Sequence, residues 1–502
     1  MFIYSLIAFF SGLAVMGIEL TASRLIAPYF GTSLFVWTNV IAVILAALSL
    51  GYYLGGRLSE RLPDLALLLR LILFAGIIVA IIPWFIRPVA SLVSFDAAAF
   101  GSTSLVIALG SFLLTVLLFF IPLMLLGMTT PFLVKLASLK RSGVGDITGR
   151  LFAVSTVGSL VGTFLPALIF IPWFGSRASL LIFAGLLMIM GLAGFKKRGV
   201  LMLLPLLVLP LGMINGQIKT DQGLLAEAET PYQYVRVYEK DGRRYLVYNE
   251  GGGVQSVWRP ETVWSGWKYY DTAALLPALR EGQRVLIVGL AGGTISRAMQ
   301  ALYGDDSDFK MDGLEIDPEV IELASRYFDL EQPNLSVINV DGRVFLEREK
   351  GNYEVIFVDA YANQLYIPFQ LSTQEFFTAA KHRLSEAGIL AMNINAANER
   401  SPLLATMENT VAAVFPFVYR LRMDQSWNYL LVASQTPIDF EVLRTRRLPI
   451  PEFEDLAQKI PDEVRIVSFD ARERIFTDNW APVEHLTDAM LWDYAVGQRD
   501  SR

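Results

Sequence analysis

Seven apolar stretches in the first 214 residues limit what this chain can fold into more than any other feature. They occupy residues 2–26, 35–54, 66–86, 104–126, 151–171, 180–195 and 200–214. The first five are long enough to cross a bilayer, since about 20 helical residues span about 30 Å of hydrocarbon. The sixth is slightly short, and the seventh contains Pro205 and Pro210, so it either spans thinned bilayer or lies shallow. We therefore expect a polytopic α-helical membrane domain over residues 1–215.

Charge is distributed unevenly between this region and the rest of the chain. Of the 42 basic and 48 acidic residues, 13 and 5 lie in residues 1–214, which leaves 29 and 43 for the remainder. An acidic remainder argues against nucleic-acid binding, because phosphate contacts need clustered Lys and Arg. The absence of cysteine excludes disulfides and thiolate chemistry. With only His382 and His485 as histidines, no metal site is expected.

The basic residues of the first region predict its orientation in the membrane. They cluster after the second, fourth and sixth apolar stretches, as Arg57, Arg61, Arg70, Lys135, Lys140, Arg141, Arg150, Lys196, Lys197 and Arg198. The intervening loops carry only Arg87 and Arg177, so the positive-inside rule puts the N-terminus in the cytoplasm. If the seventh stretch crosses, the following domain lies outside the cytoplasm; if it does not, that domain is cytoplasmic. We expect a multi-pass cell-membrane protein whose partner is the lipid bilayer, with a cytoplasmic catalytic domain as the first interpretation and the opposite side left open.

Two charged side chains, Glu19 and Arg24, lie within or near the first apolar stretch. Charges at membrane depth are costly, and they usually pair with each other or mark a functional site. The first interpretation is an internal or interfacial structural pair, and the alternative is part of a substrate path.

The remainder of the chain changes to a pattern of alternating strands and helices. Residues 228–260 are strand-rich, and the letters "KDG" at 240–242 are typical of a hairpin turn. From residue 285, buried strands such as "RVLIVGL" alternate with helices such as "GTISRAMQALY". This alternation predicts a parallel sheet covered by helices. We assign residues 216–280 to a small β-rich unit with a linking helix, and residues 281–502 to a Rossmann-like nucleoside-binding catalytic domain.

Glycines follow the first of these strands, and an acid follows the second. Gly289 and Gly293 allow the backbone to turn tightly and to approach a ligand at the carboxyl end of the sheet. Glu315 lies 22 residues beyond Gly293. A carboxylate at that strand end can accept both hydroxyl groups of a ribose.

Acids also end the third and fourth strands. Asp341, followed by Gly342, could accept a hydrogen bond from an adenine amino group, and Asp359 faces the reacting centre. The sequence "GLAGG" lacks the G-x-G-x-x-G spacing expected for a pyrophosphate, which favours a sheet of the kind that binds S-adenosylmethionine. The alternative interpretation makes these acids turn and cap residues only.

Residues 228–395 resemble the spermidine synthase family, the polyamine aminopropyltransferases. The matching segments follow the family's order: "ETPYQYVRVYE", "GGGVQS", "WKYYDTAALLPAL", "VLIVGLAGGT", "LEID", "VDG" and "VDAY". The apolar N-terminal half, with "SRLIAPYFGTSLFVW", and the C-terminal "TDNWAPVEHL" are similar to the branch of this family that is fused to a membrane domain.

This resemblance implies a transferase of the S-adenosylmethionine-type methyltransferase fold. The reaction moves an aminopropyl group from decarboxylated S-adenosylmethionine to a polyamine and releases 5'-methylthioadenosine, without a metal. The resemblance places proton acceptance at Asp359, with Tyr361 nearby. It places the nucleoside among Gln233, Gln255, Tyr270, Asp271, Gly289, Gly293, Glu315, Asp341 and Gly342. It also implies a small-molecule amine as acceptor and a homodimer.

Two departures from the family keep other functions open. Ala291 and Ala362 stand where the family usually has aspartates, and losing a charge-assisted hydrogen bond costs about 1.5–3 kcal/mol. Asp271 and Asp478 are candidates to compensate, and Asp478 with Trp480 are candidates for a lid. The alternatives are other chemistry on S-adenosylmethionine, by methyl transfer or by release of methylthioadenosine without an acceptor, and a non-catalytic nucleoside-binding membrane sensor or transporter.

Overall fold

The computed structural model of the chain describes residues 1–30, 34–93, 103–140, 142–195, 222–249, 253–266, 268–280, 283–348, 351–361, 366–423 and 427–497. The chain forms two compact units. The first comprises Met1–Lys219 and Glu229–Tyr234, and the second comprises Thr220–Ala228 and Val235–Arg502. The seventh apolar stretch, residues 200–214, lies outside the described residues. Since the β-rich segment joins the larger domain in one unit, its separate assignment to residues 216–280 stays a prediction.

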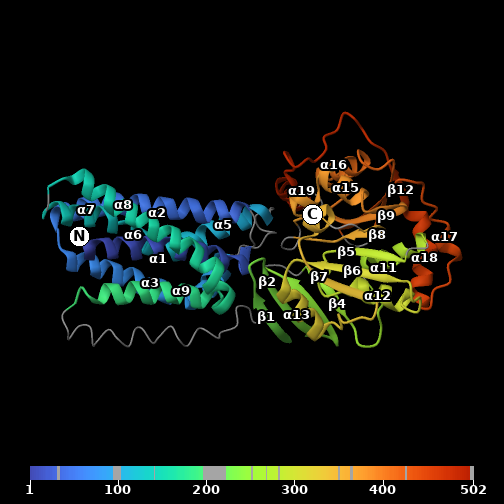
Figure 1. The fold of residues 1–502 in the computed structure, drawn as a ribbon, viewed down its shortest axis with the longest axis horizontal. Helices are drawn as coiled ribbons and strands as arrows, with labels where there is room; N and C mark the ends of the chain where they lie inside the picture. The colour runs from blue at the N-terminus through green and yellow to red at the C-terminus, as the bar shows by residue number, and fades with distance from the viewer. Residues whose placement is uncertain are drawn as a thin grey trace. The chain divides into compact units, whose positions relative to one another are not determined.

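Long apolar helices build the first unit, which is coloured blue to green in Figure 1. They are α1 (Phe2–Phe30), α2 (Leu34–Arg61), α3 (Leu65–Val93), α5 (Thr103–Thr115), η1 (Val116–Phe120), α6 (Ile121–Gly127), α7 (Thr129–Ser138), α8 (Val144–Leu165), η2 (Pro166–Phe170) and α9 (Ile171–Leu192). Several join end to end, so that the described residues contain six helical segments long and apolar enough to cross a membrane.

Glycines let α1 and α8 pack backbone against backbone. A Cβ atom at Gly158 would lie 2.0 Å from the carbonyl oxygen of Phe9, and one at Gly162 would lie 2.1 Å from that of Leu13. Any larger side chain would therefore push the two helices apart. Small residues let helix backbones approach closely, and they are common where helices pack against each other within membranes.

A small sheet precedes the main domain along the chain. Its strands are β1 (Leu224–Glu229), β2 (Tyr234–Lys240), β3 (Arg243–Tyr248) and β4 (Val254–Trp258), in that order across the sheet. Strands β2 and β3 form the antiparallel hairpin expected at "KDG". The turn residues Asp241 and Gly242 both have positive φ, 52° and 69°, which is the conformation that two-residue hairpin turns require.

An eight-stranded sheet forms the centre of the second unit. Its strands are β5 (Arg284–Val288), β6 (Lys310–Glu315), β7 (Leu335–Asn339), β8 (Tyr353–Val358), β9 (Leu384–Asn395), β10 (Phe417–Arg422), β11 (Asn428–Ser434) and β12 (Val464–Val467). They lie in the order β12-β10-β11-β9-β8-β5-β6-β7. The chain runs outward from β5 through β6 to β7 and then returns to the other side of β5 with β8. The order therefore switches between β5 and β8, where open sheets of this kind bind ligands.

Helices cover both faces of this sheet, as Figure 1 shows. They are α11 (Lys268–Ala274), η5 (Leu276–Leu279), α12 (Thr294–Tyr303), α13 (Pro318–Tyr327), α14 (Gly342–Arg348), η6 (Phe369–Leu371), α15 (Gln374–Lys381), α16 (Pro402–Ala412), α17 (Val442–Thr445), α18 (Pro451–Glu463) and α19 (Val483–Gly497). Helices α11, α12 and α18 share one apolar core with the sheet, and α14, α15 and α16 share the other. The structure thus confirms the Rossmann-like α/β fold behind an apolar helical region.

The prediction of a parallel sheet is right for five strands and wrong for three. Strands β5 to β9 pair in parallel, whereas β11 pairs antiparallel with β9, and β10 pairs antiparallel with β11 and β12. For β10 and β11 the reason lies in the connection between them, residues 423–427. A parallel pair needs a crossover of a dozen or more residues, and this connection is far shorter.

Candidate active site

The glycine turn between β5 and α12 lies against the end of β8. A Cβ atom at Gly289 would approach the carbonyl oxygen of Asp359 to 2.6 Å, and Gly289 has a φ of 91°. The amide of Asp359 donates to the carbonyl oxygen of Val288 at 2.9 Å. Gly293, with a φ of 75°, begins α12. The first and fourth strand ends predicted from the sequence therefore meet.

Glu315 joins the end of β6 to the same glycine turn. One carboxylate oxygen accepts from the amide of Ala291 at 3.0 Å, and the other accepts from the amide of Asp317 at 3.1 Å. The side chain is 6% exposed, and burial raises its pKa to about 7, against the lowering effect of the backbone hydrogen bonds. A carboxylate has about four acceptor positions, so this group can also accept a hydrogen bond from a sugar hydroxyl.

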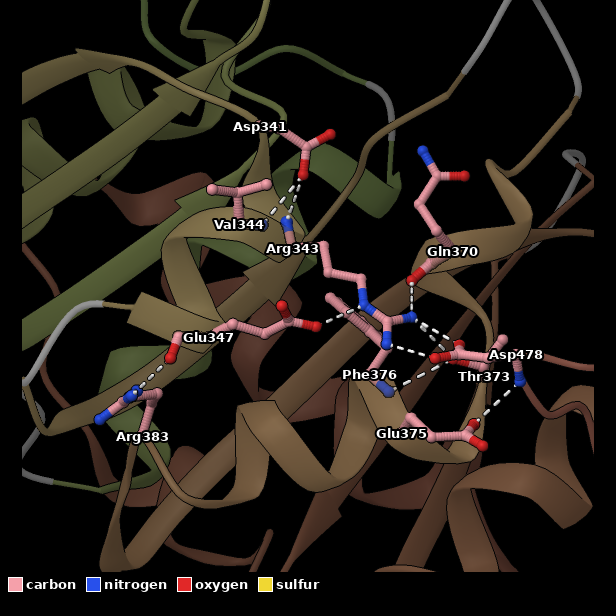
Figure 2. A network of polar contacts seen from close by, with 10 residues as sticks. All are labelled: Asp341, Arg343, Val344, Glu347, Gln370, Thr373, Glu375, Phe376, Arg383 and Asp478. Carbon is pink, nitrogen blue, oxygen red and sulfur yellow. Dashed lines mark hydrogen bonds and ion pairs between the residues drawn. The ribbon is translucent and has the colours of Figure 1, made fainter.

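Asp341 lies between the end of β7 and the start of α14, and Figure 2 shows its side chain beside Arg343 and Val344. Its Oδ1 accepts from the amides of Arg343 at 2.9 Å and Val344 at 3.0 Å. A Cβ atom at Gly342 would come within 2.4 Å of Val288, so this turn packs directly on β5. The cap role left open for Asp341 is observed, and its contact with adenine stays a prediction for the second carboxylate oxygen.

Asp359 occupies the end of β8 with one side-chain partner among the described residues. Its Oδ1 accepts from the side-chain amide of Asn393, on β9, at 2.9 Å. Asp359 retains partial access to solvent, yet protein packs closely around it, and this desolvation raises its pKa to about 7. A carboxylate with such a pKa is well matched to accept a proton at neutral pH.

Three tyrosines interact electrostatically with Asp359: Tyr269 and Tyr270, which are buried, and Tyr361, which is partly exposed. The rings of Tyr269 and Tyr270 lie 3.9 Å apart between centroids, and the Tyr270 hydroxyl donates to the carbonyl oxygen of Val254 at 2.9 Å. Burial and the charge of Asp359 raise the pKa of both phenols and that of Tyr361. All three therefore remain neutral at pH 7.

The hydroxyl of Tyr361 is committed to strand β9. It donates to the carbonyl oxygen of Asn393 at 2.9 Å and accepts from the amide of Asn395 at 3.0 Å. This arrangement makes Tyr361 a positioning residue that fixes the end of β9 beside Asp359. A direct part for Tyr361 in proton acceptance stays a prediction.

Asn393 is a site residue that the sequence reasoning missed. It is 3% exposed, and its side-chain amide donates to Asp359. Its Oδ1 is buried without a hydrogen-bond partner in the described part of the chain. A buried acceptor of this kind is costly unless something pairs with it, and an amine N–H of a substrate would do so. The available signal was the pair of amides, Asn393 and Asn395, at the end of the apolar strand "GILAMNIN".

The two acids expected to replace the missing aspartates have other partners. The carboxylate of Asp271 accepts from the amides of Ser265 at 2.9 Å and Gly266 at 3.0 Å, and burial raises its pKa to about 6. It holds the loop that precedes α11. Asp478 pairs with Arg343. Both acids thus already accept hydrogen bonds within the protein, and compensation by either one stays a prediction.

Gln255 and Gln233 lie in the strand-rich segment. Gln255 is on β4, which is tied to the glycine turn because the amide of Gly292 donates to the hydroxyl of Ser256 at 2.7 Å. Gln233 is buried just before β2, and its amide donates to the hydroxyl of Thr230 at 3.0 Å. Because Gln233 belongs to the first compact unit, its place at the nucleoside stays a prediction.

The C-terminal "TDNWAP" segment is fastened beside α14 (Figure 2). The guanidinium of Arg343 donates to both oxygens of Asp478 at 2.6 Å, and the hydroxyl of Thr373 donates to the same carboxylate at 2.7 Å. Arg343 also donates to the carbonyl oxygen of Gln370 at 3.0 Å and to Glu347 at 2.8 Å. The hydrogen bonds from Arg343 and Thr373 lower the pKa of Asp478. The pair thus links the turn at Asp341 to the predicted lid.

Comparison with known proteins gives one family match. Residues 274–427 match the spermine/spermidine synthase domain. A polyamine aminopropyltransferase of Vibrio vulnificus is 32% identical over 218 residues, which cover 41% of this chain and 70% of that protein. A probable polyamine aminopropyl transferase of Bifidobacterium longum is 35% identical over 197 residues, so the matched segment spans 39% of this chain and 43% of that relative's length.

A third relative extends the match beyond the second unit. Polyamine aminopropyltransferase 2 of Aquifex aeolicus is 22% identical over 462 residues, which cover 86% of this chain and 88% of that protein. Most of the apolar helical region is therefore included in the alignment with this relative, whose name is also that of a polyamine aminopropyltransferase.

Proposed function

Because the chain belongs to the spermine/spermidine synthase family, the polyamine aminopropyltransferases, we propose that it is a membrane-bound aminopropyltransferase. Its donor is decarboxylated S-adenosylmethionine, its acceptor is a small polyamine, and its products are the extended polyamine and 5'-methylthioadenosine. The observation that carries this proposal is the position of Asp359. Its carboxyl group has a pKa of about 7, and its backbone packs against the glycine turn at the switch in strand order.

The proposed chemistry needs one proton acceptor and little else from the protein. The neutral amine of the acceptor attacks the carbon next to the sulfonium, a C–N bond forms, and the C–S bond breaks with its electron pair left on sulfur. Asp359 accepts the proton released from the amine nitrogen. The Oδ1 of Asn393 is suited to receive a second N–H of the acceptor. Most of the acceleration then comes from holding the two substrates in line.

The nucleoside half of the site supports the same donor. We assign the carboxylate oxygens of Glu315 to the ribose hydroxyls and the second carboxylate oxygen of Asp341 to the adenine amino group. Neither acid is needed for proton transfer. Their proposed role is to set the sulfonium carbon opposite Asp359.

A second candidate rests on the glycine turn itself. At Ala291 the turn presents a methyl group and an amide bonded to Glu315, with no side-chain carboxylate for the donor's amine. A donor that keeps its own carboxylate would meet no repulsion from this side chain. We therefore retain methyl transfer, or release of methylthioadenosine without an acceptor, as the alternative reaction on S-adenosylmethionine itself.

The membrane-bound part of the proposal rests on six apolar helical segments of sufficient length. We propose that the first unit is embedded in the cell membrane and anchors the reaction there.

Mass spectrometry of defined incubations tests these proposals. Purified full-length protein is incubated with decarboxylated S-adenosylmethionine or with S-adenosylmethionine, each with and without putrescine. Spermidine formed only from the decarboxylated donor and putrescine supports aminopropyl transfer. Methylthioadenosine without spermidine, or a methylated product, supports the second candidate. Binding of the nucleoside with no product under any condition contradicts both.

A further inference from the structure

The helices of the first unit alternate in direction, which defines two faces. Connections of three residues join α1 to α2 and α2 to α3, so each helix starts at the face where the previous one ended. Packing agrees with this alternation. Helix α8 runs parallel to α1, since Gly158 packs on Phe9 and Gly162 on Leu13. We call the face that holds the beginnings of α1, α3 and α8 the N-terminal face.

Helix α9 ends at this N-terminal face. It runs antiparallel to α3, because Gly191 packs on Leu73 and Gly76 packs on Met188. Its beginning is marked by a reversal at Gly175, whose φ of 75° and ψ of 170° interrupt the helix. The residues around Gly175 therefore lie at the opposite face, and Leu192 lies at the N-terminal face.

The basic residues identify which face is cytoplasmic. By their positions in the sequence, ten of the 13 in residues 1–214 belong to or flank the connections that follow α2, α7 and α9, the helices that end at the N-terminal face. The remaining three, Arg24, Arg87 and Arg177, belong to the helix ends of the opposite face. Such an asymmetry places the N-terminal face in the cytoplasm.

Residues Glu229–Tyr234 belong to this same compact unit, and they are held at the opposite face. The guanidinium of Arg24 donates to the carbonyl oxygen of Thr230 at 3.0 Å and to that of Pro231. Arg24 lies about 33 Å along α1 from its first residue, at 1.5 Å per residue. The contact is therefore far from the N-terminal face.

Glu229 makes the second attachment, beside the reversal in α9. Its carboxylate accepts from the amide of Ser176 at 2.9 Å and from the Ser176 hydroxyl. Burial raises the pKa of Glu229, while these hydrogen bonds and the charges of Arg24 and Arg177 lower it. The buried carboxylate of Glu229 thus interacts with the charges of Arg24 and Arg177, two of the three basic residues at this face.

The chain must change faces between α9 and this segment. It leaves Leu192 at the cytoplasmic face and reaches Glu229 at the opposite one. In the described ranges after Val235 no helix qualifies as a span, and each stretch left out between them is shorter than the roughly 20 residues that a span needs. We infer that the second unit, with the glycine turn and Asp359, lies on the extracytoplasmic face of the membrane.

This orientation, taken together with the proposed function, places the reaction in a sequence of steps. A nucleoside sulfonium and a polyamine are both cations that cross a bilayer poorly, because burying an ion in hydrocarbon is costly. The step that supplies the donor is therefore transport across the membrane, and the acceptor is an amine present outside the cytoplasm.

Absence of cysteine from the chain makes the orientation directly testable. The exposed residues Ser142, at the N-terminal face, and Ser307, in the second unit, are each replaced in turn as Ser142→Cys and Ser307→Cys. Right-side-out membrane vesicles are treated with a membrane-impermeant maleimide before and after detergent. We expect Ser307→Cys to react fully in sealed vesicles and Ser142→Cys to react only after detergent. The reverse pattern, or reaction of both in sealed vesicles, would overturn the inference.

A fusion provides a second measurement that needs no cysteine. Alkaline phosphatase joined after Arg502 becomes active only outside the cytoplasm, so we expect full activity, and its loss would contradict the orientation. Neither readout depends on turnover. An inactive protein with the expected labelling would refute the proposed function alone, and an active protein with reversed labelling would refute the orientation alone.

Discussion

Glu315 and Asp359 end strands on either side of β5, and burial raises the pKa of each to about 7. Their partners differ. Glu315 accepts from two backbone amides, whereas Asp359 accepts from one side-chain amide and is surrounded by neutral phenols. A carboxylate that is fixed by backbone donors is suited to hold a ligand. One that accepts fewer hydrogen bonds is suited to exchange a proton. Two carboxyl groups with similar pKa values at one site can therefore have different tasks.

Replacing the proton acceptor should give the largest effect. Asp359→Asn keeps the shape of the side chain and removes its basicity, so turnover should fall by about 10²–10⁴-fold, the usual contribution of a general base. Nucleoside affinity should change little, because Asp359 faces the acceptor. Single-turnover rates and equilibrium binding of methylthioadenosine separate the two quantities. An unchanged rate would refute the assignment of the base.

Stability of the same variant provides the control for folding. Folding raises the pKa of Asp359 from 3.8 to about 7, so the ionised form is disfavoured in the folded state. Wild-type stability should therefore fall as pH rises from about 4 to about 7 and should level off above that range. Asp359→Asn should be at least as stable as wild type at pH 8, and a destabilised variant would make its lost activity uninformative.

Glu315→Gln should give the next largest effect, and it should act on binding. The amide keeps one acceptor oxygen but loses the charge and places an NH₂ group against a backbone amide. We expect nucleoside affinity to weaken by about ten- to a hundredfold, from the loss of about 1.5–3 kcal/mol in charge-assisted hydrogen bonding. Titration calorimetry with methylthioadenosine measures it. If turnover falls while affinity stays, the distinction between the two acids is wrong.

The glycines and acids of the site were largely predictable from the sequence, because each one lies at or just after the end of a strand. Gly289, Glu315, Asp341 and Asp359 lie at or within two residues after the ends of β5, β6, β7 and β8, and the carboxyl ends of parallel strands meet at one edge of a sheet. The helical region was equally readable, since hydropathy needs no tertiary information.

Partners that come from distant parts of the chain were not predictable. Asn393 is 34 residues from Asp359, and Asp478 is 135 residues from Arg343. Local patterns carry no information about such pairs, because strand order and the path of the C-terminal segment decide them. For the same reason the sequence named Asp478 as a candidate to compensate for a missing aspartate, without indicating that it pairs with Arg343.

Asn393→Ala should have a moderate effect on the pH dependence of kcat, because it alters the surroundings of Asp359 and not those of Glu315. The hydrogen bond from Asn393 lowers the pKa of Asp359, so its removal should raise that pKa further above 7. The acid limb of the profile of kcat against pH should therefore move to higher pH. One lost hydrogen bond of about 1 kcal/mol corresponds to roughly 0.7 of a pKa unit. A merely structural role would lower kcat at every pH without moving the limb.

Asp478→Asn should give the smallest effect, because the pair it breaks is partly exposed. The side chains of Arg343 and Asp478 are 16% and 43% exposed, and ion pairs in such settings contribute about 0.2–1 kcal/mol. Since the bidentate pair joins the turn at Asp341 to the C-terminal segment, we expect its loss to raise the KM for the nucleoside a few-fold and to leave kcat unchanged. Glu322→Gln is the matched control, because it breaks the exposed pair with Arg326, which touches neither region. Equal effects of the two substitutions on KM would show that Asp478 has no positioning role, and a fall in kcat would move it to the reacting half of the site.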